Sequence, residues 1–115
     1  MIGKKCYNDA IMIRQDIDIA GHWKLVVVYN VFLGEKDTGF TYTDFNKKRT
    51  IVGISYSTSF EEFFNTVVHE IKHVQSHICK YFNVEEDSED AAYLSGYIAE
   101  RMIGKILKML SAGIL

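Results

Sequence analysis

The first half of the chain carries the hydrophobic patterns of four β-strands. In residues 11–19, isoleucines alternate with mostly polar residues, which is the period-two pattern of a half-buried strand. Residues 25–33 form a β-branched and aromatic run that is typical of a central strand. Residues 40–45 and 51–56 are also strand-like, and the charged segment between them suits a hairpin tip. Because the links between these strands are short, we expect an antiparallel meander.

The pattern changes to a helical period after Tyr56. Ser59, followed three residues later by Glu62, has the form of a capping box, and the periodicity that starts there continues to about Phe82. With His69 placed at zero and about 100° per residue, the apolar positions form one stripe between about 120° and 220°. The members of this stripe are Phe60, Phe63, Phe64, Val67, Ile71, Val74, Ile78 and Phe82.

A second helix is predicted from Glu89 to about Leu110, with Ser88 or Asp87 as its N-cap. Strands and helices together predict an α+β fold, in which a four-stranded, mainly antiparallel N-terminal sheet is followed by two long packed helices. The length of 115 residues and the hydrophobic content of 48% favour a single domain over residues 1–115.

Charge and hydropathy exclude several classes of function. The net charge is -2 with both signs interspersed, so we expect no nucleic-acid partner. No stretch reaches the roughly 18 apolar residues that a membrane span needs. Lys4, Lys5 and Asp9 interrupt the apolar residues near the start, so we expect no signal peptide. We therefore expect no membrane association and a cytoplasmic location. Cys6 and Cys79 lie far apart and are expected to be free thiols, not a disulfide or a thiolate metal site.

The first predicted helix contains the pattern His69-Glu70-x-x-His73. Residues four apart on a helix lie one turn above each other, so both imidazoles can bind one ion at the zinc–nitrogen distance of about 2.0 to 2.1 Å. On the helical wheel, His73 falls at about 40° and Glu70 at about 100°, so the histidines face away from the apolar stripe. Glu70 then flanks the ion and can act on a water molecule there. The alternative is that both histidines are ordinary surface or hydrogen-bonded residues.

Catalytic zinc usually has three protein ligands, so a third must come from elsewhere in the chain. His77 continues the row of histidines, but positions i, i+4 and i+8 span about 12 Å of helix, which is too far to converge on one ion. His77 is then a residue that contacts the ligands without binding the ion, a residue of the substrate cleft, or a plain surface residue.

An acidic cluster at the start of the second helix supplies the candidates for the third ligand. We prefer Glu89, because one side of the helix that it opens carries small residues, which allow two helices to approach closely. These small residues are Ala92, Gly96 and Ala99. Glu86 and Asp90 are the alternatives to Glu89 as ligand. The acidic cluster can also simply complement the positive end of the helix dipole.

With these residues, the sequence resembles a minimal gluzincin, a member of the thermolysin-like clan of zinc peptidases, over residues 51–102. In that clan, the His-Glu-x-x-His helix is followed by a glutamate ligand on the next helix, and the start Glu89-Asp-Ala-Ala-Tyr93 fits this layout. The resemblance implies that His69, His73 and Glu89 hold zinc. It also implies that Glu70 is the general base. Tyr93 is then a candidate donor to the oxyanion, and the alternative is that it is an ordinary core or surface tyrosine.

The resemblance further implies a peptide or protein as substrate. Strand 51–56, which precedes the motif helix, would line the cleft, where an extended peptide could add to the sheet by main-chain hydrogen bonds. Two features depart from the clan: Lys72 places a charge between Glu70 and His73, and the chain is much smaller than other gluzincin domains. A homo-oligomer or a partner protein would then complete the cleft.

The sequence therefore predicts a zinc-dependent metallopeptidase, in which Glu70 activates water for hydrolysis of a peptide bond. One alternative is a zinc-stabilised, non-catalytic binding module derived from a peptidase fold. Another is a small interaction protein that contains no metal.

Overall fold

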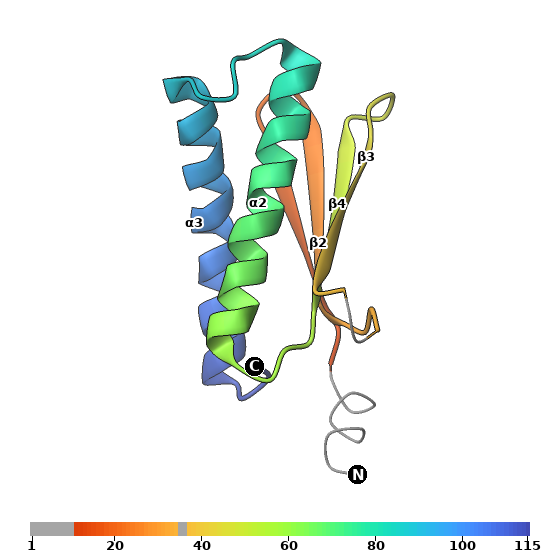
Figure 1. Ribbon diagram of the computed structural model, residues 1–115, viewed down its shortest axis with the longest axis vertical. Coiled ribbons are helices and arrows are strands. Elements are labelled where there is room, and N and C mark those ends of the chain that lie inside the picture. Colours follow the sequence, from red (N-terminus) through yellow and green to blue (C-terminus); the bar gives the residue numbers. More distant parts are fainter. Residues whose placement is uncertain (1–10, 35–36) are drawn as a thin grey trace.

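A computed structural model describes residues 11–34 and 37–115 and shows a four-stranded sheet with two long helices on one of its faces (Figure 1). The strands are β1 (Ile13–Ile19), β2 (Trp23–Val31), β3 (Gly39–Asp44) and β4 (Arg49–Ser55), and the helices are α2 (Phe60–Phe82) and α3 (Glu89–Ser111). The α+β fold, with a mostly antiparallel sheet followed by two long helices, is confirmed.

The strand order is β1-β2-β4-β3, so the predicted meander is wrong in one connection. β1 pairs with β2 and β3 pairs with β4 in antiparallel fashion, but β2 and β4 are parallel. A parallel pair needs a crossover of about a dozen residues or more. Residues 32–48, which include β3, supply that length, so the chain forms the edge strand first and β4 then returns into the position beside β2.

The central strand β2 carries most of the sheet's contribution to the core. Trp23, Leu25, Val27 and Tyr29 are all fully buried. Tyr29 also explains why a polar residue occupies the apolar side of β1: its hydroxyl donates to Gln15 Oε1 at 2.7 Å. The Gln15 amide in turn donates to the Arg101 carbonyl oxygen in α3 at 3.0 Å, so this side chain links sheet and helix.

Helix α2 begins and ends where the local sequence predicts. The Ser59 hydroxyl accepts a hydrogen bond from the Glu62 amide at 3.1 Å, which caps the first turn, and Asn83 ends the helix in the left-handed conformation. The middle of the predicted stripe is buried: Phe63, Val67, Ile71, Val74 and Ile78. Its margins are not, since Phe60, Phe64 and Phe82 are 40%, 46% and 41% exposed.

Helix α3 is capped by Ser88, whose hydroxyl accepts from the Ala91 amide at 3.2 Å. Its buried face consists of Ala91, Ile98, Met102, Ile106 and Met109. The prediction that small residues bring the helices together is wrong, because Ala92, Gly96 and Ala99 are all exposed. A methyl group added at Gly96 would meet no atom within 4 Å.

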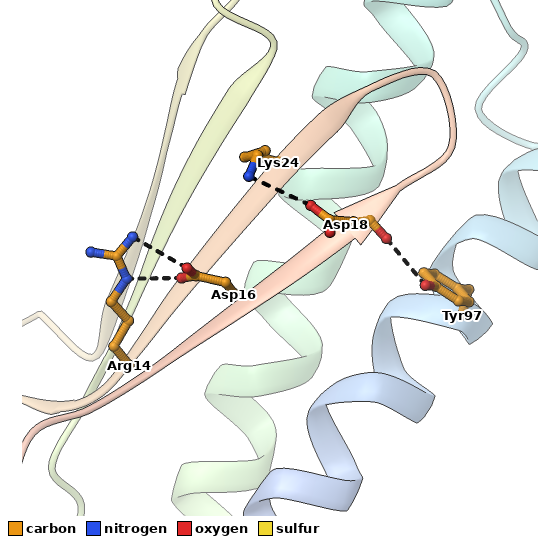
Figure 2. A network of polar contacts seen from close by, with 5 residues as sticks. All are labelled: Arg14, Asp16, Asp18, Lys24 and Tyr97. Atoms are coloured by element: carbon orange, nitrogen blue, oxygen red, sulfur yellow. Dashed lines mark hydrogen bonds and ion pairs between the residues drawn. The ribbon is translucent and has the colours of Figure 1, made fainter.

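The two helices cover different strands. Helix α2 packs against β3 and β4, whereas α3 packs against β1 and against α2. Figure 2 shows one link between α3 and β1, in which the Tyr97 hydroxyl donates to the Asp18 carbonyl oxygen at 3.1 Å. The neighbouring pairs Arg14–Asp16 and Lys24–Asp18 are exposed, so they add little to stability. Because α2 lies between α3 and β3, groups on these two elements face α2 from opposite sides.

Two further expectations concern membranes and thiols. Within the described residues, neither helix combines the length and the hydropathy that a membrane-spanning segment requires. Cys79 is a free, buried thiol, whose burial raises its pKa. Cys6, Lys4, Lys5 and Asp9 lie outside the described residues.

Candidate metal site

The imidazoles of His69 and His73 converge on the exposed side of α2. Their Nε2 atoms are 3.2 Å apart, and the two rings meet edge to face with centroids 4.8 Å apart. Two nitrogens that each bind a tetrahedral ion at about 2.0 to 2.1 Å lie about 3.3 to 3.4 Å from each other. The pair therefore fits two corners of a zinc site. In the absence of an ion, the same spacing allows one ring to donate a hydrogen bond to the other.

Glu70 lies on the other side of this turn, at the contact between α2 and β3. Its side chain is only 4% exposed, and Oε1 accepts a hydrogen bond of 2.7 Å from the Thr41 hydroxyl. A Cβ atom placed on Gly39 would come within 3.0 Å of Oε2. The carboxylate therefore occupies a space that exists because β3 carries a glycine and a threonine at these positions.

His77 also contacts β3. Its Nδ1 atom lies 2.7 Å from the Thr43 hydroxyl oxygen, and its ring lies beside Phe45 with centroids 5.9 Å apart. Burial lowers the pKa of His77, and the charges of His73 and Lys80 lower it further. His77 is thus a hydrogen-bonded residue of the α2–β3 contact and not a plain surface residue.

Strand β3 contributes to this site in a way that the sequence does not predict. Side chains alternate between the two faces of a strand, so Gly39, Thr41 and Thr43 share the face that meets α2. Two of them hold side chains of the motif helix, Glu70 and His77. The alternation of small and hydroxyl-bearing residues in β3 was the available signal. The local sequence does not show, however, that this face of the strand packs against α2.

The structure does not bring Glu89 to the histidines. Within residues 11–34 and 37–115, no three histidine, cysteine or acidic side chains form a group that could hold one ion, which applies also to Glu86 and Asp90. The reason is position along the helices. Glu89 opens α3 beside the end of α2, whereas His73 lies nine residues before that end, a rise of about 13 Å.

Glu86, one of the two other acidic candidates, has a partner of its own. The Glu86 carboxylate lies 3.6 Å from the Lys72 ammonium group, and a hydrogen bond from Ser76 lowers its pKa, together with the charge of Lys72. Lys72 thus points toward the link between the helices, so its charge does not lie between the two histidines.

Tyr93 is also remote from the catalytic candidates. Its side chain is 75% exposed on α3, whereas Glu70 faces β3 on the opposite side of α2. The oxyanion-donor role that we expected for Tyr93 therefore receives no support from its position.

The strand beside the site differs from the one predicted. β4, which contains most of residues 51–56, is hydrogen-bonded to β2 on one side and to β3 on the other, so it has no free edge for a peptide. β3 and β1 are the edge strands of this sheet, and β3 is the one that contacts Glu70. A peptide that extends this sheet on the side of the site must pair with β3.

Comparisons of this chain with protein-family models, with curated proteins and with solved structures find no match.

Proposed function

We propose that this protein binds zinc through His69 and His73 and hydrolyses peptide bonds, with Glu70 as the general base. The observation that carries the proposal is the Nε2–Nε2 distance of 3.2 Å, which suits two ligands of one tetrahedral ion. The gluzincin-like motif supplies the reaction class, because it places a carboxylate next to the first of two histidine ligands.

A zinc ion bound by these imidazoles supplies a Lewis acid that lowers the pKa of water and polarises a carbonyl group. Glu70 accepts the proton of the attacking water molecule and returns it to the leaving amine. Thr41 orients the carboxylate by donating to Oε1, which leaves Oε2 as the second proton-accepting atom. Both histidines act in their neutral form, since only the unprotonated nitrogen binds a metal.

Within the described part of the chain, the outer edge of β3 pairs with no strand, and it offers a place for the substrate. An extended peptide that hydrogen-bonds to this edge runs alongside the strand that contacts Glu70 through one of its faces. Main-chain pairing of this kind recognises the peptide backbone, and so it selects for extended peptides more than for particular side chains.

The described residues bring no third protein ligand to His69 and His73, so in this proposal another side chain supplies it. Both histidines are exposed, so a side chain of a second copy or of a partner protein can approach them from solvent. This agrees with the expectation that an oligomer or a partner completes the cleft. Two imidazoles with water in the remaining positions would bind the ion more weakly than three protein ligands do.

Metal content and peptidase activity of the Glu70→Gln variant test this function. Glutamine keeps the shape of the side chain and an oxygen for Thr41, but it cannot accept the proton. We expect about one zinc per chain in both proteins, and a loss of activity of about 10²- to 10⁴-fold in the variant. A variant that loses its zinc, or that keeps its activity, would contradict the role of Glu70.

A second function, a zinc-stabilised binding module without catalysis, is favoured by one observation. Glu70 is buried and hydrogen-bonded to Thr41, so it has a structural role in joining α2 to β3 that requires no reaction. In such a module, zinc raises the stability of the wild-type protein, and no peptide is cleaved with or without a chelator. A chelator-sensitive cleavage of any unstructured protein substrate excludes this alternative.

A further inference from the structure

A continuous chain of side-chain hydrogen bonds leads from the core to His77. The Trp23 indole donates to the Thr50 hydroxyl oxygen at 3.0 Å, and that oxygen lies 2.9 Å from the Thr43 hydroxyl oxygen. Thr43 is then 2.7 Å from His77 Nδ1. This row of hydrogen bonds crosses three strands of the sheet and ends at His77, one helical turn beyond His73.

The chemistry of the first two members gives this chain a direction. An indole N–H can only donate, so Thr50 accepts from Trp23 and its own proton needs an acceptor. Thr50 is fully buried, and among the described residues the Thr43 oxygen is the one hydrogen-bond acceptor within reach of its hydroxyl. Thr50 therefore donates to Thr43. Among the described residues, His77 Nδ1 is the other hydrogen-bond partner of Thr43, so the Thr43 hydroxyl donates to His77.

The direction fixes the tautomer of His77. Nδ1 accepts the hydrogen bond from Thr43 and so carries no proton, which leaves the proton of the neutral ring on Nε2. A proton on Nδ1 would make Thr43 accept from both Thr50 and His77, and the Thr43 proton would then have no acceptor among the described residues. The ring is thus held with its N–H on the nitrogen that does not contact β3.

We propose that this directed chain holds His77 as the neutral Nε2–H tautomer, and that His77 serves as a fixed hydrogen-bond donor to a main-chain oxygen of the bound peptide. The donor role rests on the peptidase function proposed above. Its position follows from β3: Glu70 contacts Thr41, and His77 contacts Thr43, two residues further along the same strand. Carbonyl groups of an extended peptide recur with the same period, about 6.6 to 6.8 Å for two residues.

This assignment separates His77 from the two histidines before it. A ring with a proton on Nε2 and a hydrogen bond to Nδ1 has no free lone pair for a metal ion. His77 therefore binds substrate and does not bind zinc, although it belongs to the same row of histidines.

The tautomer is tested by long-range proton–nitrogen NMR correlations of the histidine rings in the full-length chain at about pH 7.5, where an ordinary histidine is neutral. We expect His77 to show an unprotonated Nδ1 and a protonated Nε2. Thr43→Val, which keeps the shape but removes the hydroxyl, should move the ring toward a mixture of tautomers, whereas Thr43→Ser should retain the wild-type signature. A wild-type ring with its proton on Nδ1, or a signature unchanged in Thr43→Val, overturns the proposal.

The donor role is tested by two substitutions of His77 that differ in which ring nitrogen they replace. In Gln the side-chain amide nitrogen takes the place of Nε2, and in Asn it takes the place of Nδ1. We expect kcat/KM to fall about tenfold in His77→Asn and to stay closer to the wild type in His77→Gln, with zinc content unchanged in both. Equal losses in the two variants, or losses that follow the zinc content, contradict the donor role. If the wild-type protein cleaves no peptide, the proposed function and the donor role both fail, while the NMR measurement still decides the tautomer.

Discussion

Glu70 and His77 owe their positions to residues of β3 that are individually small. A glycine leaves space for the Glu70 carboxylate, and two threonine hydroxyls hold Glu70 and His77 by hydrogen bonds. Such contacts position a side chain more narrowly than apolar packing does, because a hydrogen bond depends on angle as well as on distance. At this scale, the site is defined jointly by a helix and an edge strand.

Replacing Gly39 with alanine tests how closely β3 must approach α2. The new methyl group would lie 2.8 Å from Thr66 Cγ2, 2.9 Å from the Gly53 carbonyl oxygen and 3.0 Å from Glu70 Oε2. Two of these neighbours belong to α2 and one to the adjacent strand, so the strand and helix must separate. We expect Gly39→Ala to lower the free energy of unfolding by about 1 to 3 kcal/mol, as measured by urea denaturation. An unchanged stability would mean that β3 and α2 can separate at Gly39 without losing other contacts.

The stability of the protein should depend on pH through His77. Its pKa in the folded protein lies below the ordinary value of 6.5, first because of burial and then because of the charges of His73 and Lys80. The unfolded chain therefore takes up a proton before the folded protein does, and the free energy of unfolding should decrease as the pH falls from 6.5 toward the folded-state pKa. Above this window, the ring is neutral in both states and contributes no slope.

Urea denaturation at a series of pH values measures this effect. His77→Gln, which does not titrate, is the control, and its stability should change less between about pH 7 and pH 5 than that of the wild-type protein. The same slope in both proteins would assign the pH dependence to other groups.

The elements themselves were predicted well, because their signals are local. The serine caps and the changes of hydrophobic period set the start of both helices, and residues 60–82 and 89–111 were found to within about one residue. The prediction that was wrong concerns which face of a helix contacts another element of the fold. The small residues of α3 look suited to a helix contact, but they remain exposed, and the buried face of α3 consists mainly of larger residues.

Gly96 therefore offers a way to stabilise α3. It lies in the middle of a helix, and an added methyl group would meet nothing within 4 Å. Because alanine loses less conformational freedom than glycine when a helix forms, Gly96→Ala should raise the free energy of unfolding by about 0.5 to 1 kcal/mol. Urea denaturation measures the change, and Gly39→Ala provides the opposite case, in which the same methyl group has no room. A loss of stability in Gly96→Ala would show that this position is in contact with another group.

For the whole molecule, zinc should act as a ligand of the folded state. His69 and His73 are held together by the folded helix, so zinc binds the native protein more tightly than the unfolded chain. At a free zinc concentration one hundred times the dissociation constant, we expect the free energy of unfolding to rise by about 2.7 kcal/mol. Denaturation with zinc and with a chelator measures this difference.

Single substitutions of the two histidines locate the effect. His69→Ala and His73→Ala should each remove most of the zinc-dependent stabilisation, and both positions are exposed, so the metal-free stability should change little. Glu89→Ala separates the ligand sets: it should leave the zinc effect intact, because Glu89 lies at the start of α3 and not beside the histidines. A large loss of zinc affinity in Glu89→Ala would instead support the ligand set that the gluzincin resemblance implies.

The sequence by itself determined the features that depend on neighbours along the chain. These are the four strands, the two capped helices and the placement of His69 and His73 on one exposed helix face, since a spacing of four residues brings two side chains together wherever the helix lies. Only the tertiary structure decided that β4 enters between β2 and β3, that Glu70 and His77 meet the edge strand, and that Glu89 lies remote from the histidines. Those relations join residues that are distant in sequence, and they are fixed by strand pairing and by packing of helices on the sheet, neither of which a local pattern encodes.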